Sequence, residues 1–388
     1  MKKIVYLFIL LFWSGIEAQT MVKVFENQPV NFTGNPGDTT DLVRLQDGRI
    51  LLKKITVPEF EEGTDVMVKM TLRSAGDPWD KSGSLFVITD PEKIDVIDIA
   101  KGLEKYPEAA GIEGYPGIVK TENYTPALEI LRFMTPFGVG YFSNEEVGKK
   151  RKYNRPVYIP KWEDKVVWEE NVSHLASELT GEIYVGVWID TWTADGYIID
   201  VDLEYSGRPL KEKKVVPLVN TIYYAGQKHP DLFAKTDLTS EFELPENAKN
   251  VKLHYITTGH GGHSGGDEFI KLKNTLKFDN KEVLNTIPWR DDCASFRRFN
   301  PSSGVWVKQD SGYAYNNGKK ELMLLKERIA SSDLSRSNWC PGSKVSPIEI
   351  ELGDLEKGKH ALEISIDGTP IEGDKLNHWL VSAYLTYE

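Results

Sequence analysis

The sequence predicts an all-β protein made of two antiparallel β-sandwiches. Short runs of β-branched and aromatic residues recur along the chain, and Gly, Pro, Asp or Asn separates them. Long helical patterns are scarce, and a polar, basic stretch at 208–214 divides the runs into two series. With 388 residues the chain can bury two cores. We therefore expect an N-terminal domain at 19–210 and a C-terminal domain at 211–388.

The first series contains the clearest strand, at 182–192. Alternate residues from Ile183 to Ile189 are aliphatic and mark one face. The other face carries aromatic and acidic residues, namely Tyr184, Trp188, Asp190 and Trp192. Such a face suits either a sandwich core or a sugar site, where rings stack and carboxylates accept hydrogen bonds. Asp195-Gly196 predicts a hairpin turn into a return strand at 197–205. The other strands of this series are expected at 51–57, 66–72, 85–88 and 129–136.

The second series predicts further strands, at 215–224, 251–258, 268–278, 348–352, 361–366 and 379–386. Leu322, Leu325 and Ile329 have helical spacing, which predicts a single helix at 320–329. Two long excursions, 91–123 and 145–161, interrupt the first series. The second excursion holds a basic run at 149–152, which indicates either a solvated loop or contact with an acidic glycan.

The stretch 257–269 (TTGHGGHSGGDEF) concentrates groups that can do chemistry. Its five glycines permit a contorted turn. In one interpretation the stretch is only a glycine-rich turn, and its histidines are merely exposed to solvent. A second takes His260 and His263 as metal ligands, although His-x-x-His alone is a weak signal. A serine-nucleophile interpretation is discarded because no matching triad can be placed. Glu268 begins the apolar face of the following strand, so its carboxylate should be partly desolvated with a raised pKa.

The first 18 residues have the pattern of a signal peptide: Lys2 and Lys3, an apolar core at 4–13, and Ala18 at the expected cleavage point. We therefore expect a soluble protein that is secreted or periplasmic and does not insert into membranes. Cys293 and Cys340 are the only cysteines of the sequence, and an even pair in an exported protein predicts one disulfide. A net charge of −11 argues against a nucleic-acid partner.

Several separated motifs are similar to those of a single known family. The turn Asp77-Pro78-Trp79-Asp80-Lys81, an acid on each side of an aromatic ring, resembles the Asp-Glu-Trp-Asp-Arg of that family. Residues 132–140 resemble its Arg-Phe-Ile-Thr-Pro-Tyr-Trp-Val-Gly, and residues 189–192 its Thr-Glu-Thr-Trp. Residues 267–269 fall where the family has Ala-Glu-Trp, and residues 335–342 resemble its Asp-Arg-Ala-Gly-Trp-Cys-Pro-Gly. The family is peptide-N-glycosidase F, and the resemblance to it runs in order from about Val66 to the C-terminus.

The resemblance implies two eight-stranded jelly rolls side by side, with the active site in the cleft between them. It further implies a secreted amidase that hydrolyses the bond between N-acetylglucosamine and asparagine in N-glycosylated proteins or peptides. Asp80 would take the primary role, with Glu268 and Asp190 setting its protonation state and holding water. The residues expected to bind substrate or shape its pocket are Trp79, Lys81, Trp192, His260, His263, Arg336 and Trp339. Cys293 and Cys340 match one family disulfide, which would pin the Arg336 loop.

This chain departs from the family pattern at several points. Asp190 replaces a glutamate and Lys81 replaces an arginine. The glycine-rich loop differs in length, so the counterpart of the family histidine is either His260 or His263. Carboxylates alone can supply acid and base catalysis, so we expect no cofactor and no metal, and we expect a monomer. Two alternatives stay open: a noncatalytic glycan-binding relative, and a copper-dependent monooxygenase with a double jelly roll that uses His260 and His263.

Overall fold

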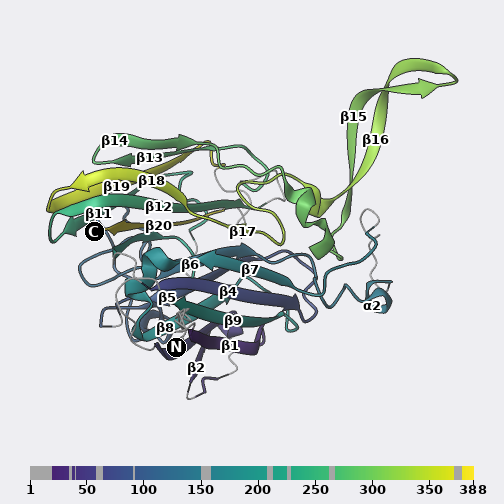
Figure 1. The fold of residues 1–388 in the computed structure, drawn as a ribbon. Coiled ribbons are helices and arrows are strands. Elements are labelled where there is room, and N and C mark those ends of the chain that lie inside the picture. The colour runs from purple at the N-terminus through teal and green to yellow at the C-terminus, as the bar shows by residue number, and fades with distance from the viewer. Residues whose placement is uncertain are drawn as a thin grey trace, which may run out of the picture.

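The computed structural model describes residues 20–34, 37–39, 41–57, 64–90, 92–149, 159–207, 213–224, 229–261, 267–370 and 378–388. The expected signal peptide at 1–18, His263, Lys150 to Lys152 and most of the expected domain boundary lie outside these residues. Within them the protein is built from antiparallel sheets with a few short helical segments (Figure 1). The prediction of an all-β fold of two sandwiches is therefore confirmed.

Two sheets form the N-terminal sandwich. One has the order β1-β9-β4-β7, with strands Thr20–Val30, Tyr197–Ser206, Asp65–Ser74 and Val166–Asn171. The other has the order β17-β6-β5-β8-β3-β2, with strands Lys344–Val345, Leu128–Met134, Ser82–Ile88, Gly181–Ile189, Ile50–Val57 and Leu42–Leu45. Alternate residues of these strands, such as Val68, Leu85, Val187 and Val201, fill the core between the sheets.

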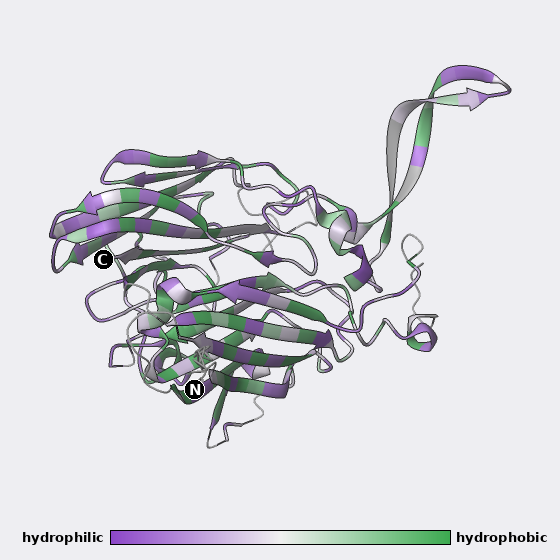
Figure 2. Ribbon diagram, viewed as in Figure 1, coloured by the Kyte–Doolittle hydropathy of each residue, from purple (hydrophilic) through white to green (hydrophobic). Residues whose placement is uncertain are grey.

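The C-terminal sandwich has two four-stranded sheets in the described part of the chain. The first has the order β10-β20-β12-β18, with strands Lys214–Asn220, His378–Tyr387, Ala248–His260 and Ile348–Leu355. The second has the order β11-β19-β13-β14, with strands Leu238–Leu244, Gly358–Asp367, Lys273–Phe278 and Lys281–Thr286. Its core contains Leu253, Leu276, Leu362 and Leu385. Hydrophobic and hydrophilic residues alternate along the strands of both sandwiches (Figure 2), as expected when one face is buried.

The two sandwiches are fastened together by strand pairing and by a buried ion pair. Strand β17, from the C-terminal half, pairs with β6 and so extends a sheet of the N-terminal sandwich. On β6, Arg132 and Glu129 are fully buried and form a bidentate pair with N···O distances of 2.6 and 2.7 Å. Arg132 also donates to Thr258 Oγ1 on β12 and to the carbonyl oxygen of Leu380 on β20. Separating the sandwiches would leave this guanidinium without those acceptors, so the pair fixes their relative position.

The short helical segments lie in the connections. They are η1 (Gln46–Gly48), α1 (Val96–Ala100), α2 (Glu145–Lys149), η2 (Ser173–Glu178), η3 (Cys293–Phe299) and η4 (Ser331–Asp333). The excursion expected at 91–123 contains α1, and the one expected at 145–161 begins with α2. No helix in the described part of the chain has the length and apolar character needed to cross a membrane.

The helix predicted at 320–329 is wrong. These residues belong to strand β16 (Lys319–Ala330), which pairs along its whole length with β15 (Val305–Asn316). The hairpin forms a two-stranded sheet that projects from the body of the protein (Figure 1). Leu322, Leu324 and Leu325 fit a helical period and a strand period equally well, and pairing with a partner strand decided between them.

The turn predicted at Asp195-Gly196 does not form a hairpin. Strands β8 and β9, on either side of it, belong to opposite sheets of the N-terminal sandwich, so the turn connects the sheets. Gly196 has a φ of +57°, and a Cβ atom there would lie 2.2 Å from the carbonyl oxygen of Val30. The strand predicted at 182–192 ends at Ile189, which leaves Asp190 and Trp192 in the connection. The strand predicted at 268–278 likewise begins only at Lys273, so Glu268 lies in the turn before it.

Candidate active site

The turn at 77–81 connects β4 to β5 and carries Asp80. Asp77, which is fully buried, accepts hydrogen bonds from the main-chain N–H of Trp79 (2.9 Å) and from the hydroxyl of Thr191 (2.7 Å). The Tyr197 hydroxyl donates to the carbonyl oxygen of Trp79 at 2.6 Å. The turn is thus held by side chains from both of its flanks, and Asp80 has a defined position.

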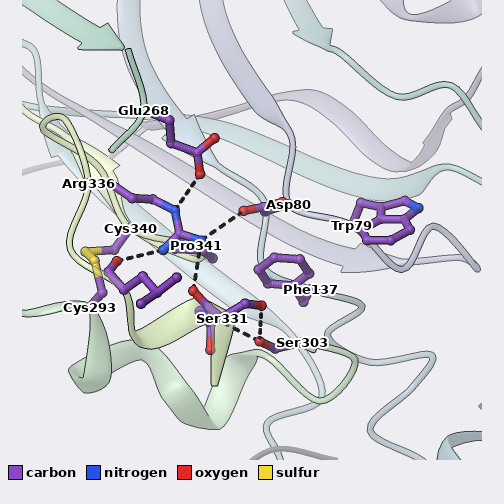
Figure 3. A network of polar contacts seen from close by, with 12 residues as sticks. Trp79, Asp80, Phe137, Glu268, Cys293, Ser303, Ser331, Arg336, Cys340 and Pro341 are labelled. Atoms are coloured by element: carbon purple, nitrogen blue, oxygen red, sulfur yellow. Dashed lines mark hydrogen bonds and ion pairs between the residues drawn. A yellow bond between two sulfur atoms is a disulfide. The ribbon is translucent and has the colours of Figure 1, made fainter. Parts of the chain in front are cut away.

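Arg336 of the C-terminal half lies between Asp80 and Glu268 (Figure 3). Its Nε donates to Glu268 Oε1 at 2.8 Å, and its Nη2 lies 3.8 Å from Asp80 Oδ2. The other donors of the guanidinium are directed to the carbonyl oxygens of Leu334 (2.7 Å) and Ser331 (2.9 Å). Only 2% of the Arg336 side chain is exposed. A buried cation surrounded by acceptors is therefore the centre to which both sandwiches bring a carboxylate.

Several contacts hold the Arg336 loop in place. The disulfide between Cys293 and Cys340, 47 residues apart, joins this loop to η3, so the predicted pairing is confirmed. Main-chain hydrogen bonds link Arg336 and Arg290 in both directions, at 2.9 and 3.0 Å. The Trp339 ring lies 4.9 Å from the guanidinium carbon of Arg336, a cation–π distance.

Burial raises the pKa of both carboxyl groups. Burial raises the pKa of Asp80, and Arg336 and Lys81 oppose this increase. Burial likewise raises the pKa of Glu268, to about 7, against the opposing charge of Arg336 and with a further increase from Asp80. The two carboxyls share one guanidinium, so deprotonating one raises the pKa of the other. Near neutral pH the pair therefore retains a proton that can be transferred.

Asp190 lies in a second cluster. Its Oδ2 accepts from the Tyr223 hydroxyl at 2.7 Å, and its Oδ1 lies 3.4 Å from Arg49 Nη1 and accepts from Trp192 Nε1 at 3.1 Å. Among the described residues, Asp190 is a hydrogen-bond partner of neither Asp80 nor Glu268. The adjacent Thr191 binds Asp77, and so the two clusters are joined through the chain at 190–191.

The tryptophans expected at the site differ in exposure. Trp79 is 47% exposed and Trp192 57% exposed, and Trp192 has the Arg49 guanidinium 4.2 Å from its ring centroid. Rings in this state can stack on a sugar. Trp339 is only 4% exposed and donates its Nε1 hydrogen bond to the carbonyl oxygen of Gly259 at 2.9 Å. Its position suits support of Arg336 better than contact with a sugar.

His260 is buried and its ring nitrogens face hydroxyl groups. Nε2 lies 2.8 Å from Thr258 Oγ1, and Nδ1 lies 3.3 Å from Ser82 Oγ. The ring stacks between those of Trp339 and His378. Within the residues that the structure describes, no three His, Cys, Asp or Glu side chains gather as metal ligands would. The glycine-rich part of this loop, with His263, lies outside those residues.

Comparison with known proteins identifies the family. The family model "Peptide-N-glycosidase F, N terminal" matches residues 21–205, and the model "Peptide-N-glycosidase F, C terminal" matches residues 228–386. The chain belongs to the peptide-N-glycosidase F family. This is a family of glycan-cleaving amidases. No curated protein matched the sequence.

Solved structures of the family have the same fold. A structure of PNGF-II is 33% identical with a TM-score of 0.81, and a second crystal form is 32% identical with a TM-score of 0.80. Each comparison covers 95% of this chain but 65% of the PNGF-II chain, so this chain spans about two thirds of that protein. PNGase F from Flavobacterium meningosepticum, described as a glycosylasparaginase, is 17% identical with a TM-score of 0.58, over 96% of each chain. At that identity the likeness concerns the fold alone.

The family motifs pointed to the acids, to Arg336 and to Trp192, but not to several other residues that hold the acids in place. Arg49 and Tyr223, which bind Asp190, lie in segments without any recognisable motif, just before β3 and shortly after β10, and only folding brings them to the site. Thr135 and Tyr197 were also not predicted from the sequence as site residues. The Thr135 hydroxyl accepts a hydrogen bond from the N–H of Lys81 and donates one to the Tyr197 hydroxyl. Thr135 does lie in the motif at 132–140, so that motif gave one usable signal.

Proposed function

We propose that this protein is an amidase that hydrolyses the bond between N-acetylglucosamine and the asparagine side chain of N-glycosylated proteins or peptides. The reaction releases the glycan and leaves aspartate. The observation that carries the proposal is the pair Asp80 and Glu268, from opposite sandwiches, on the buried guanidinium of Arg336. Membership of the peptide-N-glycosidase F family supports the same chemistry.

Amide hydrolysis needs an activated water, stabilisation of a tetrahedral oxyanion, and a proton for the departing glycosylamine. Asp80 accepts a proton from water, because a carboxylate with a raised pKa is a better base than an ordinary one. The proton retained by the Asp80–Glu268 pair then supplies the leaving amine. Lys81, half-buried beside Asp80, is the cation best placed to stabilise the oxyanion. No step in this scheme calls for a cofactor.

Arg336 acts on the acids and not directly on the sugar in this scheme. Its side chain is 2% exposed, and its donors face Glu268, Asp80 and two carbonyl oxygens. Arg336 therefore limits how far burial raises the pKa values of the two acids. This role differs from the direct contact with substrate oxygens that the family resemblance implies.

The half-exposed rings of Trp79 and Trp192 are the proposed contacts for the sugar. Asp190, which is fixed by Arg49 and Tyr223, accepts hydrogen bonds from the hydroxyl groups of the sugar. We further propose that N-glycosylated proteins or peptides are its partners. The signal-peptide pattern at 1–18 supports a secreted or periplasmic location.

The test is mass spectrometry of a purified N-glycopeptide after incubation with the protein. We expect loss of the glycan and conversion of the linked asparagine to aspartate. Free glycan with an intact N-acetylglucosamine at its reducing end should appear in equal amount. A glycopeptide that is bound but unchanged after prolonged incubation would show a glycan-binding protein instead.

A further inference from the structure

The hairpin of β15 and β16, Val305–Ala330, forms an arm that stands apart from both sandwiches (Figure 1). Each strand pairs in a ladder only with the other within the described part of the chain. An isolated two-stranded ribbon is at best marginally stable in water. A ribbon this long therefore needs something to cover it.

One face of the arm is apolar and exposed. Tyr313 lies opposite Leu322, and Ser311 lies opposite Leu324, so these side chains share a face. Tyr315, two residues along β15, lies on the same face. Tyr313, Tyr315, Leu322 and Leu324 are 70%, 78%, 64% and 61% exposed. Lys320 shares this face, with its Nζ 5.2 Å from the centroid of the Tyr313 ring. Exposed apolar side chains gathered on one face in this way mark an interaction surface.

Both roots of the arm are bonded to the segments that carry the candidate catalytic groups. On one side, the Ser302 hydroxyl donates to the carbonyl oxygen of Pro78, two residues before Asp80. On the other side, the carbonyl oxygen of Ser331 accepts from Arg336 Nη2 at 2.9 Å. The Ser303 and Ser331 hydroxyls lie 2.9 Å apart and join the two roots (Figure 3). The base of the arm is therefore attached to the segments that carry Asp80 and Arg336.

We propose that the exposed apolar face of the arm binds the polypeptide of the glycoprotein substrate, in extended conformation, beyond the glycosylated asparagine. This inference rests on the proposed amidase function. A glycan bound near Trp79 and Trp192 leaves its polypeptide to run outward. The arm begins beside the segments that carry the reacting groups and presents its apolar side chains to such a polypeptide farther out, toward the tip of the hairpin. The strand edges of the ribbon add main-chain groups to which an extended peptide can pair.

The test compares two substrates with the same glycan: a short glycopeptide that ends next to the linked asparagine, and an unfolded glycoprotein. The variant carries Tyr313→Ser, Leu322→Ser and Leu324→Ser. We expect kcat/KM on the glycoprotein to fall about tenfold or more, through KM, because buried aromatic and aliphatic contacts dominate such binding. Activity on the short glycopeptide should stay at the wild-type level. Leu325→Ser, the same kind of change on the opposite face, is the matched control and should leave both substrates unaffected.

A second variant guards against a folding artefact. Replacing residues 309–326 by Asn-Gly keeps the base of the hairpin and removes its exposed part, because this pair forms a two-residue turn. It should reproduce the selective loss. Equal activity of wild type and both variants on the glycoprotein would overturn the proposal.

A binding measurement separates the arm from the chemistry. A fluorescent unfolded polypeptide without glycan should bind wild-type protein, and anisotropy should show weaker binding to the triple variant. If the polypeptide binds in this way but no glycan is released from any substrate, only the proposed amidase function fails. If it does not bind, the proposal for the arm fails. Two other outcomes, each with polypeptide binding that the triple substitution leaves unchanged, would also overturn the proposal. A wild-type dimer that the triple substitution dissociates would assign the face to a second copy of the chain. Binding to phosphatidylglycerol vesicles that depends on the arm would assign it to a lipid surface.

Discussion

Two arginines hold carboxylates in neighbouring parts of this molecule, and they do so differently. Arg336 is almost completely buried, comes from the C-terminal half of the chain, and serves two acids and two carbonyl oxygens. Arg49 serves a single acid, Asp190, which also accepts from Tyr223 and Trp192. In one cluster two carboxylates share one guanidinium, whereas in the other three donors bind a single carboxylate.

The difference indicates different tasks. Two partly buried acids that share one guanidinium retain a proton, which suits proton transfer. Asp190 is held by a phenol, by a guanidinium and by the indole N–H of Trp192, which is itself half-exposed. An acid fixed beside an exposed ring suits the binding of a sugar. We therefore assign the chemistry to the Arg336 cluster and orientation of the sugar to the Arg49 cluster. Four predictions test this division.

The largest effect is expected for Asp80→Asn. The amide keeps the shape of the side chain but cannot accept a proton from water, so kcat should fall about 10³-fold or more. The melting temperature should stay close to that of the wild type. Release of glycan from a glycopeptide, followed by mass spectrometry, measures the change. Normal turnover by this variant would remove Asp80 from the chemistry.

Loss of the disulfide should affect the Arg336 cluster and leave the Arg49 cluster in place. A loop closed by residues 47 apart corresponds to about 4 kcal/mol of free energy of unfolding in the chain-entropy account. The double variant Cys293→Ser and Cys340→Ser should therefore melt at lower temperature and lose activity. Quenching of Trp192 fluorescence by a bound glycan should persist below the melting transition. An unchanged melting temperature would contradict the prediction.

Glu268→Gln should change the pH dependence of stability. The folded-state pKa of Glu268 is about 7, above its ordinary 4.5, so the folded protein holds a proton that the unfolded chain has lost. This contribution to stability is present below about pH 4.5 and is lost as the pH rises through about 7, by at most roughly 3 kcal/mol. The glutamine does not titrate.

Thermal unfolding at about pH 5 and about pH 8 measures this effect. The variant should gain stability relative to the wild type between the two pH values. Asp190→Asn, in the other cluster, serves as the control for substitution of an acid. Parallel pH dependence of the wild type and Glu268→Gln would show that Glu268 does not retain the proton.

The smallest effect is expected for Asp190→Asn. The amide can still accept hydrogen bonds, and Asp80, Glu268 and Arg336 keep their contacts, so the proton transfer should survive. We expect KM for a glycopeptide to rise about tenfold, with kcat changed less, as for the loss of a charged hydrogen-bond partner. Tyr223→Phe, which removes one donor to Asp190, should act in the same direction. If kcat fell further in Asp190→Asn than in Asp80→Asn, the chemistry would have to be assigned to the Arg49 cluster instead.

Local patterns were sufficient for most strands of the fold. Short runs rich in β-branched and aromatic residues predicted β-strands that the structure contains, among them those at 51–57, 66–72, 197–205 and 379–386. The errors at 320–329 and 195–196 have a common cause. In both cases the spacing of residues was compatible with two structures, and the distant partner strand or sheet selected one.

The sequence by itself determined the all-β class, the cysteine pair, and a small set of acids and tryptophans in family motifs. Only the tertiary structure decided that Asp80 and Glu268 meet on Arg336, while Asp190 is bound by Arg49 and Tyr223. The physical reason is that a proton-retaining pair depends on burial and on a shared counter-charge. Both arise where two sandwiches pack together, at positions that are nearly 190 residues apart in the chain.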